Sequence, residues 1–182
     1  MIIDLHNHTI PLSGDSSLHP RDLIEKIAGL GIDGVCLTEH NAAWDSGEVE
    51  SMAAASGIVV IPGMEITTEI GHILAFGLDR YSSEMANSER LSRIASSEGA
   101  ALVLAHPYRS SVYSRYWMNS DKSYQKAKFD LDVHGVEIFN GRGSETQNAF
   151  SANVADALQL PCLLYTSPSP RDATLYRMPS SA

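Results

Sequence analysis

Two histidines, one residue apart, follow an apolar start in the segment "MIIDLHNHTI". In an extended strand, side chains two positions apart lie on the same face, so Asp4, His6 and His8 point in one direction. Neutral imidazole nitrogens and carboxylate oxygens bind catalytic divalent metals and leave open positions for water and substrate. The segment therefore indicates a metal site at a strand end, although an isolated pair of this kind is often an ordinary polar strand end.

Later apolar segments also end in potential ligands. "GVCLTEH" ends at His40, "VVIPGMEIT" supplies Glu65, "ALVLAHP" supplies His106, and "HGVEIFN" carries Glu137 and Asn140. Taken one at a time, these side chains could cap a turn or a helix, or bond to loop backbone. The carboxyl ends of successive parallel strands converge on one face, however, so their repetition favours a single shared site.

Short apolar runs alternate with amphipathic segments along the chain. Strands are predicted at 1–6, 33–40, 58–67, 100–107 and 134–140, and helices at 19–31, 46–57, 89–99 and 144–160. Pro20 suits the first turn of the first helix, and a "GLG" sequence ends it. Repeated strand-helix units predict an α/β fold with parallel strands, arranged either as a barrel or as a doubly wound sheet.

Composition excludes several classes of protein. With 182 residues, 43% of them hydrophobic, the chain suits one globular domain. A net charge of −9 and a pI near 5.1 argue against general binding to nucleic acid or to anionic membranes. No apolar stretch approaches the roughly 20 residues that span a bilayer, and no signal peptide is recognisable. With Cys36 inside an apolar run, these features predict a cytoplasmic protein. They indicate no particular oligomeric state.

The motifs together resemble the PHP family, the polymerase and histidinol phosphatase domain. The resemblance rests on "DLHNHT", "LSGDSSLHP", "LTEH", "PGMEIT", "GHILAFG", "AHPYR" and "VEIFNGR", in that order. It implies a distorted (β/α)7 barrel that binds two or three divalent ions, namely manganese, iron or zinc. It also implies hydrolysis of a small phosphorylated metabolite, of the nucleotide or histidinol phosphate type, by metal-activated hydroxide without a protein nucleophile.

Carried over residue by residue, the resemblance implies a set of metal ligands, which comprises His6, His8, Asp15, His40, Glu65, His72 and His106. Asp4, Glu39 and Glu137 are expected to support these ligands from behind. Glu39 stands where the family carries the aspartate of "TDH", one methylene shorter. The residues expected to bind substrate are Arg109, Asn140 and Arg142.

The end of the chain departs from the family pattern. We expect residues 1–161 to form the PHP domain and 162–182 to be non-native sequence or a disordered tail. This last segment is rich in proline and serine, and "LLYTSPSPRD" can be back-translated into a common sequencing-library adapter. No strand is predicted after residue 161, and the family's late Asp-x-His pair is missing. The barrel is therefore expected to be incomplete at its C-terminal end.

Three other interpretations remain open. The chain could be a catalytically inactive fragment, or a metal-binding module with the same fold. An amidohydrolase-like barrel also starts with two histidines, but it needs a bridging lysine in the middle strands, and no lysine lies between Lys26 and Lys122.

The aromatic and cationic segment 108–130 could stack a nucleobase and hold its phosphate, or could only pack on the barrel.

Overall fold

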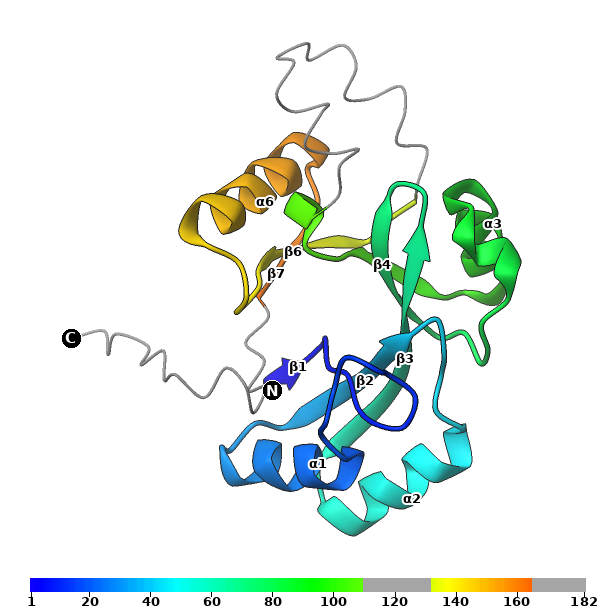
Figure 1. Cartoon of the computed structure of the whole chain (residues 1–182), viewed down its shortest axis with the longest axis vertical. Coiled ribbons are helices and arrows are strands. Elements are labelled where there is room, and N and C mark those ends of the chain that lie inside the picture. Colours follow the sequence, from blue (N-terminus) through cyan, green and yellow to red (C-terminus); the bar gives the residue numbers. More distant parts are fainter. Residues whose placement is uncertain (110–131, 165–182) are drawn as a thin grey trace, which may run out of the picture.

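A curled sheet with helices on its outer side organises the protein (Figure 1). The computed structural model describes residues 1–109 and 132–164. The strands are β1 (Ile3–Asp4), β2 (Gly34–His40), β3 (Val59–Thr68), β4 (Gly71–Phe76), β5 (Ala101–Leu104), β6 (Gly135–Phe139) and β7 (Cys162–Leu164). The helices are α1 (Pro20–Gly29), α2 (Ser46–Ser56), α3 (Ser88–Glu98) and α6 (Glu145–Leu158), with short 3-10 turns η1 (Ser83–Ala86) and η2 (Pro107–Arg109).

The seven strands follow one another across the sheet in chain order, β1 to β7. Parallel pairing joins β1 to β2, β2 to β3, β5 to β6 and β6 to β7. The sheet curls into a half-barrel in which, among the described strands, β1 and β7 are the two edges. The predicted α/β class and the incomplete seven-stranded barrel are confirmed.

The all-parallel strand pattern is wrong at β4, which runs antiparallel to both β3 and β5. β3, predicted at 58–67, runs from Val59 to Thr68, and β4, which was not predicted as a separate strand, starts at Gly71. A connection as short as residues 69–70 can join only antiparallel neighbours. Gly71 has φ +134°, a conformation that glycine adopts without steric cost. This hairpin places His72 opposite Thr67 in the ladder.

The prediction that no strand follows residue 161 is also wrong. Cys162–Leu164 forms β7, which pairs in parallel with β6 from Val136 onward. Leu163 packs against the buried group formed by Leu74, Val103 and Ala105, which explains why this short stretch is held. A strand of three residues is too short to show periodicity in the sequence. The segments 110–131 and 165–182, with the predicted base-stacking residues and most of the predicted tail, lie outside the described residues.

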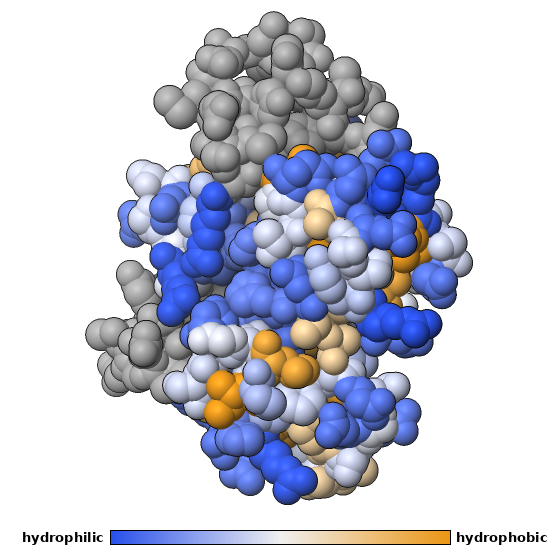
Figure 2. All heavy atoms as spheres, turned by 45° about the vertical axis from the view of Figure 1, so that its right-hand side comes forward, coloured by the Kyte–Doolittle hydropathy of each residue, from blue (hydrophilic) through white to orange (hydrophobic). Residues whose placement is uncertain are grey.

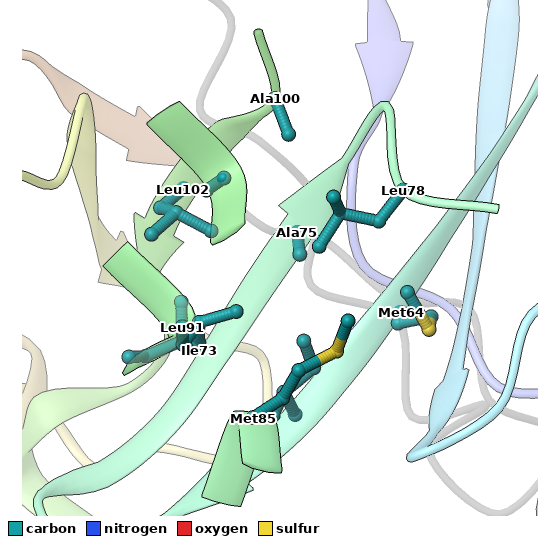
Figure 3. Close-up of a cluster of buried hydrophobic side chains, with 10 residues drawn as sticks. Met64, Ile73, Ala75, Leu78, Met85, Leu91, Ala100 and Leu102 are labelled. Atoms are coloured by element: carbon teal, nitrogen blue, oxygen red, sulfur yellow. The ribbon is translucent and has the colours of Figure 1, made fainter. Parts of the chain in front are cut away.

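The largest buried cluster lies between the sheet and α3 (Figure 3). Met64 and Ile66 of β3 and Ile73 of β4 are fully buried there and meet Leu91 of α3 and Leu102 of β5. Since successive strand residues alternate between faces, Glu65 must lie on the opposite, concave face. The packing of the outer face therefore fixes which residues of β3 and β4 point into the half-barrel.

A second cluster fixes the first strands. Leu23, Ile24 and Ile27 of α1 pack on Val35 and Leu37 of β2, as their helical spacing predicts. Strand β2 is buried from Gly34 to Glu39 and only its last residue is partly exposed. Because β2 is buried up to Glu39, His40 is the partly exposed residue at the carboxyl end of this strand.

The surface is mainly polar on the face shown in Figure 2, where apolar residues form small separate groups. None of the helices in the described part of the chain has the length and apolar character needed to cross a membrane. Burial raises the pKa of the Cys36 thiol to about 12, so that cysteine stays protonated and unreactive at neutral pH.

Candidate metal centre

The carboxylate of Glu65 lies at the centre of a group of five imidazoles. It is 1% exposed. Oε1 lies 2.8 Å from His72 Nδ1 and 2.9 Å from His106 Nε2. Oε2 lies 3.0 Å from His40 Nδ1, 3.1 Å from His8 Nε2 and 3.4 Å from His6 Nε2. Both carboxylate oxygens therefore face imidazole nitrogens from different strands.

Strand pairing explains this convergence. His6 and His8 directly follow β1, and His40 ends β2, where it pairs with Glu65 of β3 in the parallel register. His72 comes from the antiparallel strand β4, and His106 follows β5. The predicted first-loop ligand, Asp15, reaches the same place, with its Oδ2 3.3 Å from His40 Nε2. All seven predicted ligands are thus brought together, whereas their binding of metal stays a prediction.

The donor atoms form overlapping groups, each compact enough for one ion. These groups are His6, His8 and Glu65; His40, Glu65 and His72; His8, Asp15 and His40; and His6, His106 and Glu137. Nitrogen and carboxylate oxygen are the ligands that zinc, manganese and iron accept. Glu65 belongs to two of these groups, and its Oε1 faces His72 and His106 while its Oε2 faces His40, His8 and His6, so the donor set fits divalent metal ions beside this carboxylate.

The electrostatics of the cluster favour cations. Burial alone would raise the pKa of Glu65, but hydrogen bonds from His106, His40, His6 and His72 lower it well below its usual value. The hydrogen bond to Glu65 likewise raises the pKa of His40. Burial lowers the pKa of His6, yet the carboxylates of Glu137 and Glu65 outweigh burial and raise that pKa to about 10. A proton held on His6 balances part of the negative charge of the buried carboxylates, whereas burial lowers the pKa of His106. Divalent ions could balance the same negative charge instead.

Glu137 of β6 supports two of the candidate ligands from behind. Its Oε1 lies 3.2 Å from His6 Nδ1, and its Oε2 accepts the backbone N–H of His106 at 2.7 Å. The Asn140 amide donates to Glu137 Oε1 at 3.0 Å. A carboxylate bound to one ring nitrogen orients the other nitrogen toward a metal, so Glu137 leaves His6 Nε2 facing Glu65.

Glu39 lies behind the first loop and is fully buried. It accepts the Thr9 backbone N–H at 2.8 Å and the Trp44 indole N–H at 2.9 Å, and the hydroxyls of Thr9 and Ser13 also donate to it. Its carboxylate is therefore directed at the loop rather than at the imidazoles. Ser13, which the sequence analysis did not select, connects it to the cluster.

Asp4 lies below His6 and is 5% exposed. Its Oδ1 accepts the His6 backbone N–H at 3.5 Å, whereas Oδ2 has no hydrogen-bond partner among the described residues. Desolvation by burial raises the pKa of Asp4 to about 6 despite hydrogen bonds that lower it. Asp4 is thus close to the cluster, but the ring nitrogens of His6 face Glu65 and Glu137 instead.

Two residues of the site have a left-handed backbone. His106 has φ +25° and Asn41, directly after His40, has φ +50°. The Asn41 side chain accepts the Thr67 backbone N–H at 2.9 Å, which stabilises the turn that ends β2. Non-glycine residues in this region cost energy and are concentrated at functional sites. The surrounding structure therefore stabilises the unusual backbone conformation at the strand ends that carry His40 and His106.

The predicted substrate residues lie at the edge of the cluster. The Arg109 guanidinium carbon is 5.7 Å from the centroid of the Tyr108 ring, and that ring is 6.1 Å from the His106 ring. The Tyr108 hydroxyl and the Arg142 backbone N–H both donate to Asn140 Oδ1, at 3.4 and 3.1 Å. Asn140 is 3% exposed, so its amide forms part of the buried wall of the site. The structure brings these residues near the cluster but tests none of them as substrate ligands.

The fold and the site together define a half-barrel α/β protein with a candidate divalent-metal centre on its concave face. A PHP domain family model matches residues 4–150. The chain therefore belongs to the PHP domain family, and the resemblance drawn from the motifs is confirmed. The predicted boundary at residue 161 stays a prediction.

The chain is also similar to individual proteins. The chain is 29% identical over 150 residues to the uncharacterized protein MJ1587 of Methanocaldococcus jannaschii, covering 77% of this chain and 82% of the relative. A candidate metal-dependent phosphoesterase from Bifidobacterium adolescentis has a similar fold, with TM-score 0.67, 15% identity, and coverage of 92% of this chain and 89% of the other.

Two further structures share the fold. An amidohydrolase from Chromobacterium violaceum, with bound sulfate and no metal, has TM-score 0.69, 17% identity, and coverage of 93% and 88%. A two-domain protein from Bacteroides vulgatus, which contains a predicted PHP-like metal-dependent phosphoesterase, has TM-score 0.58 and 20% identity. That match covers 88% of this chain and 49% of the other protein. At these identities the similarity shows the fold alone.

Proposed function

We propose that this protein is a metal-dependent phosphoesterase that hydrolyses a small phosphorylated metabolite. The observation that carries the proposal is the buried Glu65 carboxylate, whose two oxygens face five imidazoles from four different segments of the half-barrel. Membership of the PHP domain family supports the same reaction class.

Two divalent ions, either manganese, iron or zinc, would be held on the two sides of Glu65. His6 and His8 would bind one of them, and His40 and His72 would bind the other. His106 and Asp15 lie close enough to complete these sets. When bound, such ions supply Lewis-acid activation of water and neutralise charge on phosphoryl oxygens. No side-chain nucleophile is required.

The remaining residues of the site would orient the ligands and the substrate. Glu137 holds His6, and the Asn140 amide holds Glu137, so we assign Asn140 a supporting role in addition to the predicted contact with substrate. Arg109 and Arg142 lie beside Tyr108 and Asn140 and would provide cations for phosphate oxygens. A nucleotide or histidinol phosphate is the substrate type that the motifs favour.

An assay of aryl phosphate hydrolysis in the presence of manganese or zinc tests the proposal. The parent protein should turn over the substrate, a chelator should abolish turnover, and His8→Ala should lower it by more than the roughly 10- to 100-fold that loss of a ligand-orienting partner costs. His19→Ala, which changes an exposed histidine outside the cluster, should retain full activity. Full activity in His8→Ala would refute the proposal.

Two alternatives give different results in the same experiment. If the protein is a metal-binding module or an inactive fragment, zinc will bind but no phosphoester will be cleaved. If it is an amidohydrolase, as the similar fold from Chromobacterium violaceum allows, amide or lactone substrates will be hydrolysed in preference to aryl phosphates.

A further inference from the structure

The first loop of the site is built around a hydroxyl that touches two of the candidate ligands. Ser13 is fully buried. Its Oγ lies 3.3 Å from His8 Nδ1 and accepts the His40 backbone N–H at 3.1 Å. The same Oγ is also hydrogen-bonded to a carboxylate oxygen of Glu39. One hydroxyl therefore links the buried Glu39 to both histidines.

The donor and acceptor roles of Ser13 can be assigned by counting. A hydroxyl has one proton and two lone pairs. The Glu39 carboxylate has only acceptors to offer and is the strongest acceptor within reach, so the Ser13 proton is donated to it. The His40 backbone N–H uses one lone pair. The remaining lone pair faces His8 Nδ1, which can form a hydrogen bond only by donating.

This count has a consequence for the opposite nitrogen of His8. In a neutral imidazole, a proton on Nδ1 leaves Nε2 with a free lone pair. His8 Nε2 is the atom that faces Glu65, at 3.1 Å. If the Ser13 proton pointed to His8 instead, the fully buried Glu39 Oε2 would lose one donor and keep the Thr9 backbone N–H among the described residues. When His8 donates from Nδ1, Ser13 and Glu39 keep all their partners, and His8 Nε2 can accept a hydrogen bond from His6 Nε2, which lies 3.1 Å away.

We propose that Ser13, held by Glu39, is a positioning residue that fixes the Nδ1–H tautomer of His8 and so presents Nε2 to the metal. The inference rests on the proposed function in that it assigns His8 as a metal ligand. It differs from the supporting role predicted for Glu39, because Glu39 acts through Ser13 and the loop rather than on an imidazole. It also assigns a specific role to Ser13, which lies in the loop between His8 and Asp15.

The tautomer can be measured directly. Imidazole nitrogen NMR of isotope-labelled, metal-free protein, recorded at a pH where the ring is neutral, distinguishes Nδ1–H from Nε2–H. The parent protein should show His8 as the Nδ1–H tautomer. An Nε2–H tautomer of His8 in the parent protein would overturn the inference without any variant.

Ser13→Ala tests the link to the metal. It should lower the share of the Nδ1–H tautomer at His8 and weaken zinc binding, measured by calorimetry, by about 10- to 100-fold, the usual effect of removing a group that orients a ligand. Ser151→Ala is the matched control, because Ser151 is equally buried but donates to Gln147 in α6. Zinc affinity and a tautomer equal to those of Ser151→Ala would refute the role of Ser13.

The test does not depend on whether the Ser13→Ala variant folds. If Ser13→Ala does not fold, Ser13→Cys takes its place, because a thiol retains most of the volume but is a weak donor and acceptor. The outcome is separable from that of the proposed function. If the parent protein neither binds zinc nor cleaves phosphoesters, the proposed function fails, whereas the His8 tautomer still decides whether Ser13 sets it.

Discussion

We expect the carboxyl group of Asp4 to make the metal-free protein less stable at neutral pH than it would be with a neutral side chain. Asp4 is buried beneath His6, and one of its oxygens has no hydrogen-bond partner among the described residues. Asparagine has nearly the same shape and no charge, and its carbonyl oxygen can still accept the His6 backbone N–H. We therefore expect Asp4→Asn to stabilise the metal-free protein.

The size of the effect follows from the pKa of Asp4. Burial raises this pKa from 3.8 to about 6. One pKa unit corresponds to about 1.4 kcal/mol, so the ionised form of Asp4 costs the folded state about 3 kcal/mol. Since the folded pKa is the higher one, the native state gains from protonation below pH 3.8, and this gain is lost as the pH rises through about 6. The advantage of Asp4→Asn should grow over the same range.

Urea unfolding of metal-free parent and variant, followed from acid to neutral pH, measures this difference. The free energy of unfolding of Asp4→Asn should exceed that of the parent by up to about 3 kcal/mol above pH 6 and by much less near pH 4. The exposed Asp79→Asn serves as the control and should show no such trend. A difference that does not change with pH would show that burial of the Asp4 charge is not what separates the two proteins.

The other two predictions concern the support of the site and the packing of β3. Glu137→Gln should weaken zinc binding about 10- to 100-fold in a calorimetric titration, because a neutral amide no longer holds the His6 Nδ1 proton as strongly; the exposed Glu50→Gln should bind as the parent does. Gly63→Ala should lower the free energy of unfolding by about 1–3 kcal/mol, because the added methyl carbon would lie 2.8 Å from the Phe76 ring. Gly29→Ala, with open space at that position, should be neutral or stabilising in the same urea titration, and equal effects of the two alanines would contradict the packing argument.

Much of the site was predictable because its residues occupy strand ends. His40 and His106 follow buried runs that are recognisable as strands, and parallel pairing brings such ends together whatever the details of the loops. His6 and His8 are predictable from their spacing alone. The same logic explains why the α/β class could be predicted, since apolar strands and amphipathic helices alternate with clear punctuation.

What the sequence did not predict depends on contacts between distant residues. The direction of β4 is set by a two-residue connection at 69–70 in a stretch that also resembles the end of a parallel strand. The strand β7 is held by packing of Leu163 rather than by any local pattern. Ser13 has no distinctive sequence signal, because its importance comes from Glu39 and His8 meeting it from two sides.

The position of Glu65 at the centre of the site depends on the antiparallel direction of β4. Glu65 is the residue of the cluster that contacts five imidazoles, and it lies inside β3 rather than at its end, which is possible because β3 continues into the hairpin with β4. That continuation also supplies His72, which reaches Glu65 Oε1 from the antiparallel strand. A parallel strand ending at Glu65 would have left Oε1 with His106 alone among the described residues. The departure from the regular barrel pattern is therefore what allows one carboxylate to face two sets of ligands.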